Sequence, residues 1–147
     1  MARTPSGPTL WLSLFRTTEA MHRVAARSMA NAGLGFSDFT LLEVLLHIGP
    51  LTPSALAEKL GLTSGSITAA LDRLESRGLI GRGVNPADQR SRIIELTDAG
   101  RALIGPAYTA HAADIEALVR RALTAEQRRE LFGLLGAVRK TARENTP

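Results

Sequence analysis

The hydrophobic pattern changes its period in the middle of this chain, and that change constrains the fold more than any other feature. Up to Gly78 the apolar residues recur at spacings of three and four, as in amphipathic helices. After Gly78 they alternate, first around Arg82 and Val84 and then through Ile93–Leu96. The turn-rich stretch Asn85–Ser91 lies between these two runs. Two short strands joined by such a stretch predict a β hairpin inserted into an otherwise helical chain.

Proline and glycine divide the rest of the chain into helical blocks. Ser37 or Asp38 is the expected cap of the second helix, and Thr63 or Ser64 that of the fourth. Thr124, with Gln127 three residues later, matches a capping box at the start of the last helix. Four helices are thus expected before the hairpin and two after it. Their approximate ranges are 9–32, 37–48, 52–59, 64–77, 99–122 and 124 onward.

Composition places the chain among globular proteins that lack disulfides. Hydrophobic residues make up 44% and charged residues 22% of the 147 positions, which suits one domain with its own core. The longest apolar stretch, Leu41–Ile48, contains Glu43 and His47, so we expect no membrane span. The first residues lack the apolar core of a signal peptide, and cysteine is absent. We therefore expect a cytoplasmic protein without thiol chemistry.

Two helices joined by a short turn that contains glycine, at residues 52–59 and 64–77, form a candidate helix-turn-helix. One face of the second helix is apolar and can pack on the first: Ile67, Ala70, Leu71 and Leu74. The opposite face is small, polar and free of acid near the helix start, so it fits the DNA major groove, about 12 Å wide. The residues expected there are Ser64, Gly65, Ser66, Thr68 and Ala69, and Arg73 a turn later can reach a base edge or a phosphate.

The hairpin that follows is basic. Residues 76–92 contain four arginines (Arg77, Arg82, Arg90 and Arg92) against one acid, Asp88. A cationic hairpin beside a helix-turn-helix predicts a wing, with a polar loop at residues 85–92 as its tip. Arg90 is expected to enter the narrow minor groove, and Asp88 to hold its guanidinium by a charge-assisted hydrogen bond. The alternative is a winged helix used for protein contact, in which Arg90 and Arg92 are only a solvated loop.

At this point a family resemblance becomes visible. Residues 51–103, LTPSALAEKLGLTSGSITAALDRLESRGLIGRGVNPADQRSRIIELTDAGRAL, resemble the MarR family of bacterial winged-helix transcription regulators. The Asp-x-Arg of the hairpin, followed by LT-x-x-G, is the most specific part, and the flanking helices match in number and length. The resemblance implies a mainly α fold with a two- or three-stranded wing, a homodimer on palindromic DNA, and repression relieved by a ligand. It also implies that Ser64, Ser66, Thr68 and Arg73 lie in the major groove. The lack of cysteine excludes the thiol-oxidation branch of the family.

The terminal helices carry apolar faces that the central block is too small to cover. We expect most of these faces to pair with a second subunit, because two DNA-reading heads must lie one helical turn, about 34 Å, apart. The alternative is a helical layer within one chain. Residues 1–36 and 98–147 are then dimerisation helices, and 37–97 the DNA-binding part of a single continuous domain. The predicted interface residues are Leu10, Leu14, Leu118, Leu131, Leu134, Leu135 and Val138.

An organic effector is the ligand that the resemblance implies, in a cleft between the helical layer and the winged head. The candidate lining residues are equally suited to a core: Phe36, Phe39, His47 and Tyr108.

Other site chemistries have weaker support. A metal-sensing site would combine His22, His47 and His111 with Glu43 or Asp114, but their spacing shows no ligand pattern. No nucleophile–base pair, phosphate-binding loop or spaced carboxylate pair indicates an enzyme. We expect no catalytic residue and no cofactor, and double-stranded DNA as the main partner.

Overall fold

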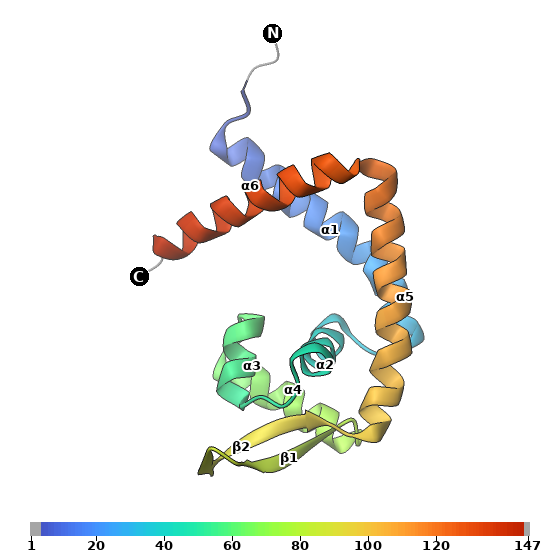
Figure 1. Cartoon of the computed structure of the whole chain (residues 1–147), viewed down its shortest axis with the longest axis vertical. Coiled ribbons are helices and arrows are strands. Elements are labelled where there is room, and N and C mark those ends of the chain that lie inside the picture. The colour runs from blue at the N-terminus through green and yellow to red at the C-terminus, as the bar shows by residue number, and fades with distance from the viewer. Residues whose placement is uncertain (1–3, 146–147) are drawn as a thin grey trace. The chain divides into compact units, whose positions relative to one another are not determined.

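The computed structural model describes residues 4–145, and its element order confirms the predicted one (Figure 1). Four helices precede a two-stranded hairpin, and two helices follow it. The elements are α1 (Gly7–Asn31), α2 (Phe36–Ile48), α3 (Pro53–Leu60), α4 (Ser64–Ser76), β1 (Ile80–Asn85), β2 (Asp88–Leu96), α5 (Asp98–Ala122) and α6 (Ala125–Glu144). The described residues up to Ala112 form one compact unit, and those from Ala113 form another.

Side-chain caps determine where several helices begin. The Thr63 hydroxyl accepts the backbone N–H of Ser66 at 3.2 Å, so Thr63, of the two candidates, caps α4. Thr124 and Gln127 form the predicted capping box of α6. The predicted cap of α2 is wrong, because its N-cap is Gly35 and no side chain bonds there. Asp38 lies inside the first turn of α2, and its carboxylate is used elsewhere.

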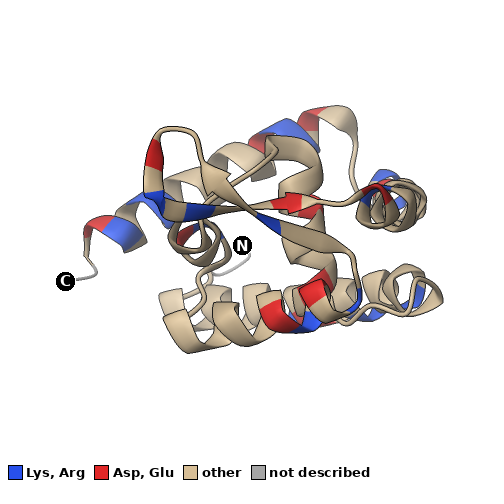
Figure 2. Ribbon diagram, turned by 90° about the horizontal axis from the view of Figure 1, so that it is seen from below, with Lys and Arg blue, Asp and Glu red and all other residues tan. Residues whose placement is uncertain are grey.

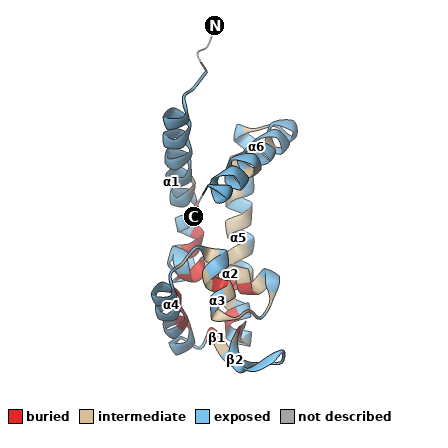
Figure 3. Ribbon diagram, turned by 90° about the vertical axis from the view of Figure 1, so that its left-hand side faces the viewer, coloured by how far each residue is buried: buried red, intermediate tan, exposed pale blue. Residues whose placement is uncertain are grey.

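The core of the first unit is built around α2. Phe39, Leu41, Leu42 and Leu45 are at most 1% exposed. Helix α2 contacts α1, α3, α4 and β2. The predicted inner face of α4 is confirmed, since its four apolar residues are all buried. Buried residues gather where these elements meet, whereas the hairpin end is exposed (Figure 3). The helix-turn-helix is therefore held from behind by a continuous apolar core.

The hairpin is antiparallel and longer than the sequence suggested. Its register pairs Ile80 with Leu96 and continues to Val84 with Arg92. Leu51 adds a single bridge to Ile94, with N–O distances of 3.1 and 2.8 Å, so two strands and one isolated bridge form the wing. The expected loop at residues 85–92 is wrong, because β2 already begins at Asp88.

Thr97 joins the hairpin to α5. Its hydroxyl donates to the carbonyl of Gly78 at 2.7 Å and accepts the N–H of Gly100 at 3.0 Å. One side chain thus caps α5 and fixes the end of β2 to the end of α4. This contact accounts for the threonine of the LT-x-x-G run.

The second unit consists of the end of α5 and helix α6. Glu116 binds Arg120 at 2.5 Å and Arg128 at 2.9 Å. The hydrogen bond from Arg120, with a further one from Arg128, lowers the pKa of Glu116 below its usual value. Helix α6 contains no buried residue. Over the described part of the chain, no helix combines the length and the apolar character that a membrane crossing requires.

Candidate nucleic-acid interface

The exposed side of α4 has the surface predicted for a groove-reading helix. Its residues there are small and uncharged, and all five are exposed: Ser64, Gly65, Ser66, Thr68 and Ala69. The Thr63 hydroxyl donates to the Ser66 hydroxyl at 2.9 Å, and the Thr68 hydroxyl donates to the Ser64 carbonyl at 2.8 Å. These local bonds hold the first two turns in one conformation. A helix with such a surface can approach base edges closely.

Arg73, which we predicted to reach a base edge or a phosphate, has a partner within the protein. Its guanidinium is not directed freely outward but binds Asp38 of α2, with Nη2 to Oδ1 at 2.5 Å. The Nε group donates to the same carboxylate at 3.1 and 3.2 Å. The hydrogen bonds that Arg73 donates to Asp38, and the negative charge of that carboxylate, raise the pKa of Arg73 above its usual value. Half of the Arg73 side chain remains exposed, at 49%.

Two further arginines from the predicted basic cluster also have protein partners. Arg77 donates to the carbonyl of Gly33 at 3.2 Å and lies 3.9 Å from the Asp38 carboxylate. Arg82 of β1 binds Asp72 and, at 2.9 Å, Glu75, both on α4. Arg82 therefore fixes the hairpin to α4. Two of the four arginines counted from the sequence thus have acidic partners within the described residues.

The end of the hairpin is a compact hydrogen-bonded structure. The register changes between Val84 and Asn85, so that residues 89–91 bulge out of the ladder. Asn85 donates to the Ser91 hydroxyl at 2.8 Å, and Ser91 donates to the Asp88 carbonyl at 3.0 Å. The Asp88 carboxylate accepts the backbone N–H of Arg90 at 3.0 Å. It therefore positions the Arg90 backbone, rather than its guanidinium as we predicted.

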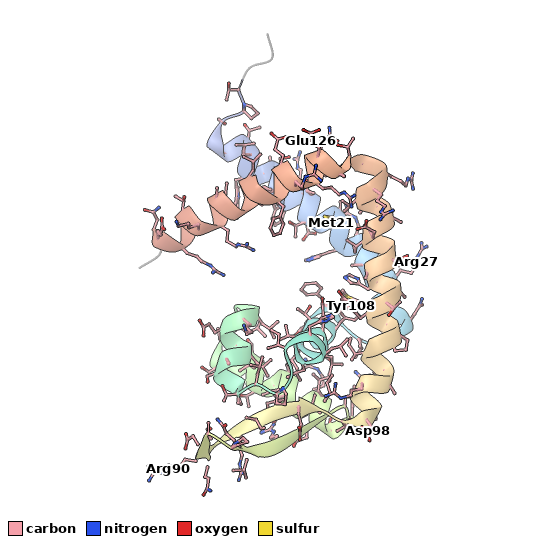
Figure 4. All side chains as sticks on the ribbon, in the orientation of Figure 1. Met21, Arg27, Arg90, Asp98, Tyr108 and Glu126 are labelled. Carbon is pink, nitrogen blue, oxygen red and sulfur yellow. The ribbon has the colours of Figure 1, made fainter. Side chains whose placement is uncertain are left out.

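Arg90 lies at the centre of this bulge, and its side chain extends from the tip of the hairpin (Figure 4). Arg92 follows in β2, opposite Val84, and both arginines are exposed. Basic positions are visible on the hairpin in Figure 2. Within residues 4–145, no acidic side chain forms an ion pair with either arginine. The wing therefore presents two available cations next to an uncharged helix face.

The four predicted effector residues do not form one site. His47 packs on Tyr108 with ring centroids 4.4 Å apart, and Phe39 packs on His111 at 5.0 Å. Phe39 is fully buried, whereas Phe36 is 53% exposed and lies 4.5 Å from the ring of His22. The ring contacts thus place the three histidines beside three different partners. No three potential metal ligands converge anywhere in the described ranges.

A concavity on the first unit is lined by none of those four residues. It lies between the end of α1 and the first half of α5. Its lining is mostly small: Ser28, Asn31, Ala32, Ala102, Leu103, Pro106, Ala107 and Ala110.

Sequence reasoning missed the residues that position the predicted ones. From the sequence, Asp38 was a candidate helix cap. Its partner in the structure, Arg73, lies thirty-five positions further along the chain. Asn85 and Ser91 read as ordinary turn residues. A signal for Asp38 did exist, because a lone acid beside a strongly apolar helix needs a cationic partner when it is buried. Nothing in the sequence pointed to which arginine that partner is.

Comparisons with known proteins agree with this geometry. A MarR family model matches residues 32–91, which contain the helix-turn-helix and most of the hairpin. The HTH-type transcriptional regulator MhqR of Bacillus subtilis is 30% identical over 110 residues, covering 75% of this chain and 76% of that relative. An uncharacterised HTH-type transcriptional regulator of Bacillus cereus is 30% identical over 134 residues, covering 91% and 89%.

Solved structures show the same fold. A mutant of MarR from E. coli complexed with operator DNA has a TM-score of 0.79 and 26% identity, covering 88% of this chain and 92% of that one. AbsC of Streptomyces coelicolor, a MarR family transcriptional regulator, has a TM-score of 0.84 at 18% identity, covering 98% of this chain and all of that one. The fold, the winged helix-turn-helix and the curated relatives lead to one conclusion: this chain belongs to the MarR family of DNA-binding transcription regulators.

Proposed function

We propose that this regulator represses transcription by binding a palindromic operator as a homodimer, and that a small organic effector releases it. The observation that carries the proposal is the pairing of an exposed, uncharged face on α4 with the exposed Arg90 and Arg92 of the adjacent hairpin. The helix face suits base edges in the major groove, and Arg90 suits the electronegative minor groove. A relative from E. coli has been solved with operator DNA, which supports the same use here. A protein with this role acts in the cytoplasm.

The homodimer is supported by apolar surface that one chain leaves uncovered. Helix α6 exposes Leu131, Leu134, Leu135 and Val138 by 41–59%, and α1 exposes Leu10 and Trp11 by 52% and 70%. Exposed apolar surface of this extent marks an interaction site. A twofold dimer presents two equal heads, and two equal heads require a palindromic site.

The effector response is supported less directly, by the polar ring pair of His47 and Tyr108 next to an otherwise apolar core. An imidazole and a phenol can both hydrogen-bond a small aromatic molecule that carries a polar group. We propose this pair as the place where an effector binds; Phe36, whose ring packs on His22 instead, is not part of it. Phe39 is a core residue in this scheme, because it is fully buried.

Selection of bound sequences from random duplex DNA tests the main proposal. We expect a palindrome with half-sites about one helical turn apart. Binding of the selected duplex should weaken steeply as salt rises, because phosphate contacts dominate affinity. A salt slope near zero, with no enriched sequence, would instead identify a winged helix that contacts protein.

A further inference from the structure

Asp38 is an acidic residue in an unusual place. It lies in the first turn of α2, yet the residue is only 6% exposed. A carboxylate in that turn ordinarily interacts favourably with the positive end of its own helix. Here both oxygens are directed at α4. Because a buried charge is costly unless it is paired, the groups that satisfy this carboxylate are held firmly.

Two cations satisfy it, Arg73 in α4 and Arg77 at the C-cap of that helix. Arg73 presents Nε and Nη2 to the carboxylate in a fork, with the shortest distance 2.5 Å, and its Nη1 is 3.4 Å from the carbonyl of Ala69. Arg77 lies 3.9 Å from the other carboxylate oxygen and also binds Gly33, in the connection between α1 and α2. We call Asp38, Arg73 and Arg77 the Asp38 cluster. In this cluster both guanidinium groups are directed towards the start of α2.

The cluster changes the charge that the recognition helix offers to DNA. The first two turns of α4 carry no charge, and the later acids Asp72 and Glu75 bind Arg82. A free arginine on an exposed helix would bind phosphates of any sequence, since phosphate contacts carry no sequence information. An arginine already engaged by a carboxylate adds little to such contacts. Arg90 and Arg92 of the wing, by contrast, form no ion pair with a described acid and stay available to phosphates.

We infer that Asp38 is a specificity-determining positioning residue: it holds Arg73 away from the DNA backbone, so that the uncharged start of α4 reads bases. This inference rests on the proposed DNA-binding function. Asp38 acts through Arg73 and does not itself touch DNA.

The test is Asp38→Asn, which keeps the size of the side chain and removes its charge. Affinity is measured against the selected operator and against a scrambled duplex over a salt series. With Arg73 released, non-specific affinity rises severalfold and the ratio of specific to non-specific affinity falls. The slope of log affinity against log salt steepens by about 0.9 for each additional phosphate that the protein neutralises. An unchanged slope and an unchanged ratio would overturn the inference.

Two further variants separate positioning from a purely structural role. Glu58→Gln makes the same charge change at an exposed position on α3 and should leave slope and ratio close to wild type. Asp38→Asn combined with Arg73→Gln removes the released cation and should restore the wild-type slope. If Asp38→Asn acted only by disrupting the structure, the second substitution would not restore the wild-type slope.

Arg73→Gln by itself gives an independent measurement should Asp38→Asn fail to fold. Because Arg73 makes no phosphate contact in this scheme, its replacement leaves the wild-type slope unchanged. A slope shallower by about 0.9 per head would show that Arg73 binds phosphate directly and would overturn the inference. If the wild-type protein binds no duplex at all, the proposed function itself fails, and the role of Asp38 fails with it.

Discussion

Gly100 of α5 lies directly against the main chain of Leu79: a Cβ atom at Gly100 would be 2.0 Å from the Leu79 carbonyl oxygen. The same atom would be 3.3 Å from a methyl group of Leu96. The carbonyl belongs to the backbone that leads into β1 and accepts the N–H of Thr97 at 3.2 Å, so it cannot move aside cheaply. The close approach of helix and hairpin therefore requires glycine at this position.

Gly100→Ala should accordingly reduce the free energy of unfolding by about 1–3 kcal/mol, the usual cost of overpacking. Gly133→Ala, inside helix α6 with nothing near the added Cβ and no proline after it, is the control. It should raise stability by about 0.5–1 kcal/mol, because alanine loses less backbone entropy in a helix. Urea unfolding followed by circular dichroism measures both variants. Equal stability of the two would show that α5 and the hairpin separate freely.

The hairpin shows how far sequence reasoning reaches. Alternating apolar residues correctly predicted two strands, because they report which side chains face the core. The stretch Asn85–Ser91 was predicted to be a loop, because its composition is typical of turns. In the structure the side chains of Asn85 and Ser91 bond each other across the bulge, and β2 begins at Asp88. Such a bond depends on which two residues meet, and composition does not record that.

Helix α4 likewise has features that the sequence predicts and contacts that it does not. Its buried and exposed faces follow from helical periodicity, and the prediction was confirmed for all four inner residues. The partner of the Arg73 side chain cannot be predicted from helical periodicity, because Asp38 lies in another helix. Local patterns thus predict faces and caps, whereas ion pairs between helices depend on tertiary packing.

Arg90→Ala should weaken operator binding by about 1–3 kcal/mol while leaving thermal stability unchanged. The reason is that Arg90 is exposed at the wing tip, where its backbone N–H, and not its side chain, bonds Asp88. Arg101→Ala, which removes an exposed cation from the first turn of α5, is the control for net charge. Fluorescence polarisation with a labelled operator measures both. Equal affinities for the two variants would remove the wing arginine from the interface.

Ser91→Ala tests whether the tip positions Arg90. It removes the acceptor for Asn85 and the donor to Asp88, and should cost about 0.5–1.5 kcal/mol of operator affinity. In the Arg90→Ala background the same change should cost markedly less, because the arginine that it positions is gone. Gln89→Ala, at an exposed neighbour in the bulge, serves as control. Strictly additive losses in the double variant would contradict a positioning role.

Leu134→Glu should prevent dimer formation without unfolding the chain. Leu134 is 59% exposed in the single chain, so a carboxylate there costs the monomer little. In a dimer the same carboxylate would be buried without a partner, which is strongly unfavourable. Lys140→Glu also places an acid on α6, about a third of a helical turn around from Leu134, and should leave the dimer intact. Analytical ultracentrifugation distinguishes the two, and operator affinity should fall with the dimer, because a single head contacts only one half-site. A Leu134→Glu protein that sediments as wild type would place the subunit interface elsewhere.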